Sequence, residues 1–103
     1  FEEEGERCAK LFADPKKTVM VMGNHGVLVA GQSVAVAFNH LYYFERAAKN
    51  LVKAYGTGRK LRVLSDKIAE KTSQAIHEYP SLAEAHFLEL RAILDQEDSD
   101  YQD

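Results

Sequence analysis

The tightest constraint on the fold is a turn between two valine-rich segments, Met20-Val21-Met22 and Val27-Leu28-Val29. The turn between them reads Gly23-Asn24-His25-Gly26. Short apolar, β-branched runs are typical of strands, and Asn and Gly between them favour a tight reversal of the chain. We therefore predict strands over residues 18–23 and 26–30, buried on both faces, with a histidine held at the strand end.

His25 is the first candidate functional residue, because an imidazole held at the end of buried strands suits a metal ligand. The alternative is a turn histidine whose ring is hydrogen-bonded to nearby backbone. The residue pattern alone leaves both interpretations open.

Composition limits the class of protein. The chain has 103 residues, of which 46% are hydrophobic and 28% charged, and this is typical of one small globular domain. The net charge is -3 with basic residues spread along the chain, so we expect no nucleic-acid partner. The longest apolar runs are too short to span a bilayer, so we expect no membrane partner. A start rich in glutamate and a single cysteine, Cys8, favour a cytoplasmic protein.

Four helices are predicted, over Glu2–Phe12, Ser33–Tyr55, Ser65–Glu78 and from Ser81 after a break at Pro80. The longest has a continuous apolar stripe at spacings of three and four residues. Its members are Ala37, Leu41, Phe44, Ala48, Leu51 and Tyr55. In the third helix Ile68, Thr72, Ala75 and Ile76 are predicted to face inward, and in the last helix Leu82, Ala85, Phe87, Leu88 and Leu94. Gln96–Asp103 is predicted to be an acidic, mobile tail.

Two strands alone make a marginal sheet with open edges, and the long helix has more apolar surface than two strands can cover. The chain also begins at Phe1 rather than at a methionine. We therefore expect residues 1–103 to be the C-terminal part of one larger domain, with further strands supplied by an N-terminal half.

Motifs around the turn extend the pattern. They are the string Val21-Met22-Gly23-Asn24-His25-Gly26-Val27-Leu28-Val29-Ala30-Gly31, followed by Ser33 and Ala37-Phe38, with Glu4-Gly5-Glu6-Arg7 ahead and Phe44-Glu45-Arg46-Ala47-Ala48 in the long helix. Together they resemble the class II aldolase/adducin family. The ending, Leu94 to Asp103, is similar to the bacterial adducin-like branch.

The resemblance implies an α/β fold, an α/β/α layered domain with a central, mostly antiparallel sheet. It also implies a divalent metal, usually zinc, held by three histidines. Two of these form a His-x-His pair in the N-terminal half, and His25 matches the third. Catalytic zinc with three protein ligands keeps one position open for substrate. Family members commonly form homotetramers, and a contact through Tyr42, Tyr43 and Phe44 is a candidate.

The other polar residues considered are weaker candidates for a functional site. His40, His77 and His86 lack His-x-His spacing and are predicted to be structural. Glu45 is either an acceptor that orients a ligand such as His25 or one half of a salt bridge. Cys8 is predicted to fill apolar space on the first helix.

Two functions follow as expectations. The first is a divalent-metal-dependent, aldolase-type carbon–carbon lyase or epimerase. Its substrate would be a sugar phosphate or related hydroxy-carbonyl compound, cleaved through a metal-bound enediolate. The second is a non-catalytic, adducin-like domain for assembly or protein binding. A fold by itself does not decide between them.

Overall fold

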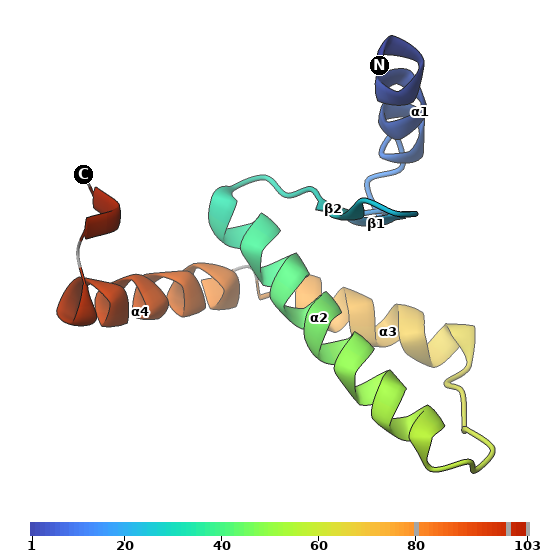
Figure 1. Ribbon diagram of the computed structural model, residues 1–103. Helices are drawn as coiled ribbons and strands as arrows, with labels where there is room; N and C mark the ends of the chain where they lie inside the picture. The colour runs from blue at the N-terminus through green and yellow to red at the C-terminus, as the bar shows by residue number, and fades with distance from the viewer. Residues whose placement is uncertain (80, 99, 103) are drawn as a thin grey trace. The chain divides into compact units, whose positions relative to one another are not determined.

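The computed structural model describes residues 1–79, 81–98 and 100–102. The chain divides into two compact units, Phe1–Phe44 and Glu45–Asp103. The first contains α1 (Glu2–Leu11), β1 (Val19–Met22), β2 (Gly26–Val29) and the start of α2 (Val34–Gly56), as labelled in Figure 1. The second contains the rest of α2, α3 (Asp66–His77), α4 (Ser81–Glu97) and the 3-10 turn η1 (Asp100–Gln102).

The strands form the predicted hairpin, a two-stranded antiparallel sheet. Val19 pairs with Val29 at the open end, and Met22 pairs with Gly26 beside the turn. One further backbone bond, from the Ala30 N–H to the Thr18 carbonyl at 2.8 Å, extends the pairing beyond the strands. Helices with a small antiparallel sheet agree with the α/β class.

The prediction that both strands are buried on both faces is wrong for this chain. Val21 is 68% exposed and Leu28 is 39% exposed. The physical reason is that β1 and β2 contact each other but no other helix or strand within the described residues. The face of a sheet is buried only when another layer of structure packs on it.

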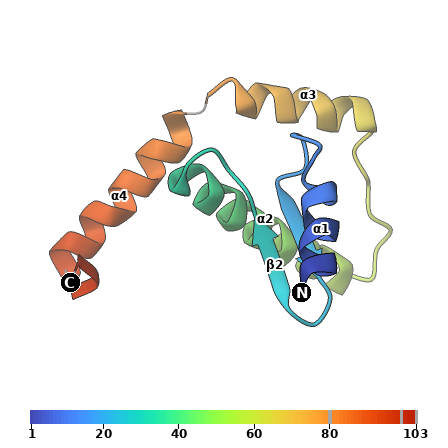
Figure 2. The same cartoon turned by 90° about the horizontal axis from the view of Figure 1, so that it is seen from above.

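Serine caps begin two of the helices where they were predicted. The Ser33 Oγ accepts a hydrogen bond from the Val36 N–H at 3.2 Å, and the Ser65 Oγ accepts one from the Ile68 N–H at 3.4 Å. Each cap satisfies a backbone donor that the first turn of a helix leaves without a partner. An extended connector joins α2 to α3, as Figure 2 shows. The predicted break at Pro80 lies outside the described residues.

The apolar faces of the helices are present but are not covered. Ala35 and Ala83 are the buried hydrophobic residues among those that the structure describes. Most positions predicted to face inward are exposed, and these are Leu41, Leu51, Tyr55, Ile68, Thr72, Ala75, Ile76, Leu82, Ala85, Leu88 and Leu94. The prediction that these positions face inward is wrong for the described residues, because an apolar stripe becomes core only when another element packs on it.

The C-terminal segment is more ordered than the predicted mobile tail. Helix α4 continues through Gln96 to Glu97, and a 3-10 turn follows. The Tyr101 hydroxyl donates to Asp95, and the Gln102 Nε2 donates to the same carboxylate at 2.6 Å. These bonds fold the end of the chain back onto the last turn of α4. None of the helices in the described part of the chain is long and apolar enough to cross a membrane.

Candidate functional site

His25 lies at the tip of the hairpin, in a turn whose backbone is closely defined. The His25 N–H donates to the Met22 carbonyl at 3.2 Å. Asn24 has φ +68°, a conformation that Asn tolerates better than most residues, and Gly26 follows with φ +125°. In the turn from Met22 to His25, φ is positive at the third residue, Asn24, and not at the second, Gly23. This pattern is typical of a type II turn. Local chemistry therefore holds the histidine backbone in place even though the strands are not buried.

The imidazole of His25 is exposed, and no side chain or carbonyl of the described residues is hydrogen-bonded to it. Two other histidines differ in this respect. The His40 Nδ1 donates to the Ala30 carbonyl at 2.8 Å, and the His77 Nδ1 donates to the Ser73 carbonyl at 2.7 Å. His86 also has an interaction within the structure. Among these four histidines, His25 is the one whose ring has no bond at either nitrogen within the described residues, whereas His40 and His77 each use Nδ1.

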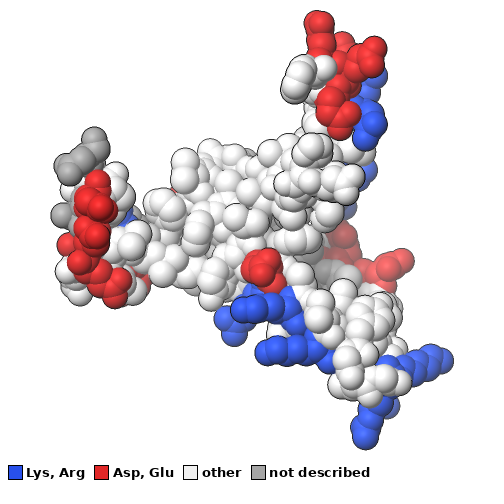
Figure 3. Space-filling model, in the orientation of Figure 1, with Lys and Arg blue, Asp and Glu red and all other residues white. Residues whose placement is uncertain are grey.

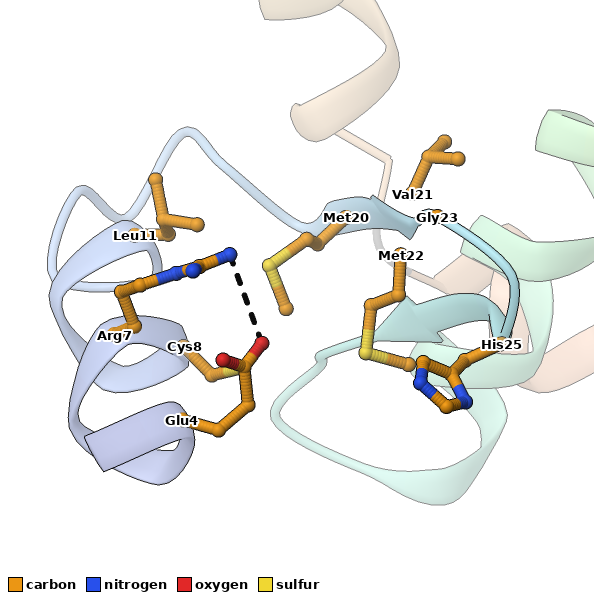
Figure 4. A pocket seen from close by; sticks show the side chains of 9 residues that line it. All are labelled: Glu4, Arg7, Cys8, Leu11, Met20, Val21, Met22, Gly23 and His25. Atoms are coloured by element: carbon orange, nitrogen blue, oxygen red, sulfur yellow. Dashed lines mark ion pairs between the residues drawn. The ribbon is translucent and has the colours of Figure 1, made fainter. Parts of the chain in front are cut away.

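A hollow of about 450 Å³ lies between α1 and β1, and His25 lines one side of it. Figure 4 shows its lining residues, which are Glu4, Arg7, Cys8 and Leu11 from α1, Met20, Val21 and Met22 from β1, and Gly23 and His25 from the turn. The Arg7 guanidinium and the Glu4 carboxylate form an ion pair at 3.7 Å. Both of these side chains are largely exposed, so the pair contributes little to stability.

Cys8 is half-buried on α1 and lines this hollow, and its predicted role of filling apolar space stays a prediction because α1 has no buried residue. Sequence separation gave no sign that Cys8 and His25 would line one space. Glu45 is exposed on the part of α2 that belongs to the second unit. Its role in orienting a ligand stays a prediction.

The residues that the structure describes do not by themselves fit the metal that the resemblance implies. Catalytic zinc takes three protein ligands. Within the ranges that the structure describes, no three His, Cys, Asp or Glu side chains gather where they could hold a metal ion. His25 offers one nitrogen, and the remaining donors are not supplied by the described residues.

Two methionines beside the turn also line the site, although no sequence motif singled them out. Met20 and Met22 are two residues apart on β1, so both lie on the face that meets the hollow, while Val21 projects the other way in Figure 4. The alternation of side chains along β1 was predictable from the sequence, but it did not show that α1 lies across the hollow from Met20 and Met22. Glu4 and Arg7, already part of the family-like motif, prove to line the same hollow.

Comparison with known proteins adds one positive finding. Residues 1–52 match the family described as "Class II Aldolase and Adducin N-terminal domain". The matched segment contains α1, the hairpin with His25 and most of α2. Neither the curated proteins nor the solved structures contain a significant match to the chain.

Proposed function

Because the chain belongs to the class II aldolase and adducin family, we propose that it is part of a divalent-metal-dependent, aldolase-type lyase or epimerase. The substrate is a sugar phosphate or a related hydroxy-carbonyl compound, and His25 supplies one ligand to the metal, zinc being the first choice. Such a metal, when bound, polarises a carbonyl oxygen. The observation that carries the proposal is the exposed, unbonded His25 ring on a defined turn inside the matched segment.

The ligand set is completed by residues outside this sequence. We propose that residues 1–103 form the C-terminal part of an α/β/α domain with a mostly antiparallel sheet, and that a His-x-His pair precedes them. The hairpin supports this proposal because neither of its edges pairs with another strand in the described part of the chain, and Val21 exposes apolar surface. Open, apolar sheet edges are normally covered or paired.

Metal analysis of the purified full-length protein tests the proposal. We expect one divalent ion per chain, lost in His25→Ala and retained in His77→Ala. His77 is a suitable control because it is also exposed, but it lies on α3 and its ring is bonded within that helix. Release of a carbonyl product from a panel of sugar phosphates should follow the same pattern.

Absence of metal in the folded, wild-type protein would contradict the enzyme proposal. If folded His25→Ala retains its full metal content, His25 is not a metal ligand, although the family assignment still holds. Hydrogen exchange tests the domain proposal separately, because outward-facing amides of β1 and β2 should be protected in the longer protein if further strands pair with them.

The second candidate is an adducin-like domain for assembly, and one observation favours it. Tyr42 and Tyr43 form an edge-on pair with ring centroids 5.3 Å apart, and Tyr43 is 59% exposed. Exposed tyrosines are enriched in subunit interfaces. This candidate is favoured if the purified protein is a homotetramer that contains no metal, and if Tyr43→Ala dissociates that tetramer. Both functions are compatible with a cytoplasmic protein.

A further inference from the structure

The basic residues are less evenly spread than expected, because a strongly basic stretch follows Glu45, outside the candidate site. From Arg46 to Ser65 the chain has six lysines and arginines and no acidic residue. Arg46 has an interaction within the structure. We define the basic surface as the other five, Lys49, Lys53, Arg59, Lys60 and Arg62. All five are exposed, and none forms an ion pair with a described residue. Figure 3 shows blue side chains gathered over the later part of α2 and beyond its end.

The helix itself does not explain this concentration of charge. Lys53 lies in the last turn of α2, where a cation is favoured by the helix dipole. Lys49 lies one turn earlier, on the same face, where two like charges four residues apart repel each other. An anionic partner would remove this repulsion.

The connector that contains the other three basic residues begins at a defined turn. The Thr57 hydroxyl donates to the Ala54 carbonyl at 2.8 Å and accepts from the Arg59 N–H at 3.2 Å. Gly58 has φ +68°, which a glycine adopts without strain. Apolar side chains are interspersed among the charges, since Tyr55 is 67% exposed and Val63 is 90% exposed. The basic surface therefore fits an element that is both acidic and apolar.

The end of the same chain has this chemistry. We define the acidic tail by four carboxylates, Asp95, Glu97, Asp98 and Asp100, which are all exposed. The bonds from Tyr101 and Gln102 to Asp95 shape the tail. Leu94 and Tyr101 add apolar surface, each about half exposed. Little conformational entropy is then lost when the tail binds.

We propose that the acidic tail of one copy of this protein binds the basic surface of a second copy. Charge complementarity carries the proposal, because the tail has four carboxylates, the basic surface has five cations, and both elements offer apolar side chains. A second copy is favoured over a nucleic acid or an anionic membrane because its tail offers apolar side chains, Leu94 and Tyr101, that can pack on Tyr55 and Val63 of the basic surface. Each exposed ion pair is weak, so the contact depends on several pairs and is sensitive to salt.

Zero-length crosslinking tests the contact directly in the full-length protein. Unlabelled and nitrogen-15-labelled copies are mixed, and a carbodiimide joins lysine amines to carboxylates that touch them. We expect mass spectra to contain mixed-isotope peptides that join Lys49, Lys53 or Lys60 to the acidic tail. These peptides should disappear in about 1 M sodium chloride, where the Debye length is about 3 Å.

Two charge-reversed variants supply the second test. One variant is Lys49→Glu/Lys53→Glu, and the other is Glu97→Lys/Asp100→Lys, which leaves Asp95 and its two bonds intact. Each variant alone should lose most of the crosslinks and weaken self-association at least about tenfold, because like charges then meet at the reversed positions. An equimolar mixture should recover association, since the unchanged acidic tail of the first variant can bind the unchanged basic surface of the second.

The matched control is Lys67→Glu/Lys71→Glu on α3, which changes charge by the same amount outside the basic surface. It should crosslink and associate like the wild type. The proposal is overturned if crosslinks join only peptides of the same isotope, if the mixture fails to associate, or if the α3 control has the same effect. Binding of the wild type to phosphatidylserine vesicles or to DNA, without crosslinks between copies, would also overturn it and identify a different partner.

Discussion

The Nδ1 of His40 donates a hydrogen bond of 2.8 Å to the carbonyl oxygen of Ala30. Ala30 follows the last residue of β2, and His40 lies in the second turn of α2. The bond therefore joins the end of the strand to the helix that follows it, across ten residues of sequence. Its direction also determines the tautomer, because a carbonyl can only accept. This contact supports the predicted structural role of His40, and the variant below tests it.

Replacement of His40 by alanine should lower the free energy of unfolding by about 1 kcal/mol, the usual worth of a neutral hydrogen bond. Urea denaturation monitored by circular dichroism measures the change. Asn50→Ala, at an exposed position of the same helix, is the control and should stay within about 0.5 kcal/mol of the wild type. Equal stability of the two variants would mean that the bond contributes nothing.

Gly31→Ala should destabilise the same corner of the fold. A Cβ atom at this position would lie 2.6 Å from the backbone nitrogen of Ala37, a clash that only a backbone shift relieves. We expect a loss of about 1–3 kcal/mol, as for other overpacked sites. Gly5→Ala has the opposite expectation, a gain of about 0.5–1 kcal/mol, because Gly5 is inside a helix with open space around it. Thermal unfolding of both variants should show shifts of opposite sign.

Asn24→Ala should strain the turn that presents His25. Asn24 has φ +68°, and alanine lacks the side-chain amide that makes this region tolerable, at a cost of about 1 kcal/mol. Asn24→Gly should be at least as stable as the wild type, since glycine has no Cβ penalty there. Chemical denaturation of the two variants separates these outcomes. If Asn24→Ala is as stable as Asn24→Gly, residue 24 does not have a positive φ and the turn adopts another conformation.

Ser33→Ala should shorten or destabilise the start of α2. The lost bond is the one that the Val36 N–H donates to the Ser33 Oγ, and the expected cost is about 1 kcal/mol. Ser33→Asp keeps an acceptor at the cap and adds a charge that the helix N-terminus favours, so stability should return. Amide exchange of the first turn of α2 gives a local readout. Fast exchange in the aspartate variant as well would contradict the capping role.

Local features were predictable because they depend on residues close together in the chain. The Asn24-His25-Gly26 turn, the serine caps and the helical stripes follow from backbone preferences and side-chain periods that span a few residues. The structure confirms the hairpin and all four helices to within one or two residues. The folded tail was missed because its order comes from side-chain bonds to Asp95, which no periodic pattern reveals.

The candidate site was only partly predictable. His25 was identified from its turn and from its family-like motif, while its place beside Cys8, Met20 and Met22 required α1 to lie opposite β1. The aldolase-type chemistry, the metal and its other ligands stay proposals, because they depend on groups that the described residues do not supply.

By itself, the sequence determined which segments become strands and helices, and that a histidine occupies the hairpin tip, since short-range sterics and hydrogen bonding decide these features. Only the tertiary structure decided which apolar faces are covered, that His40 is bonded to Ala30, and that Gly31 leaves no room for a side chain. The physical reason is that burial and close approach depend on which surfaces meet, and a residue's neighbours in sequence do not specify its neighbours in space.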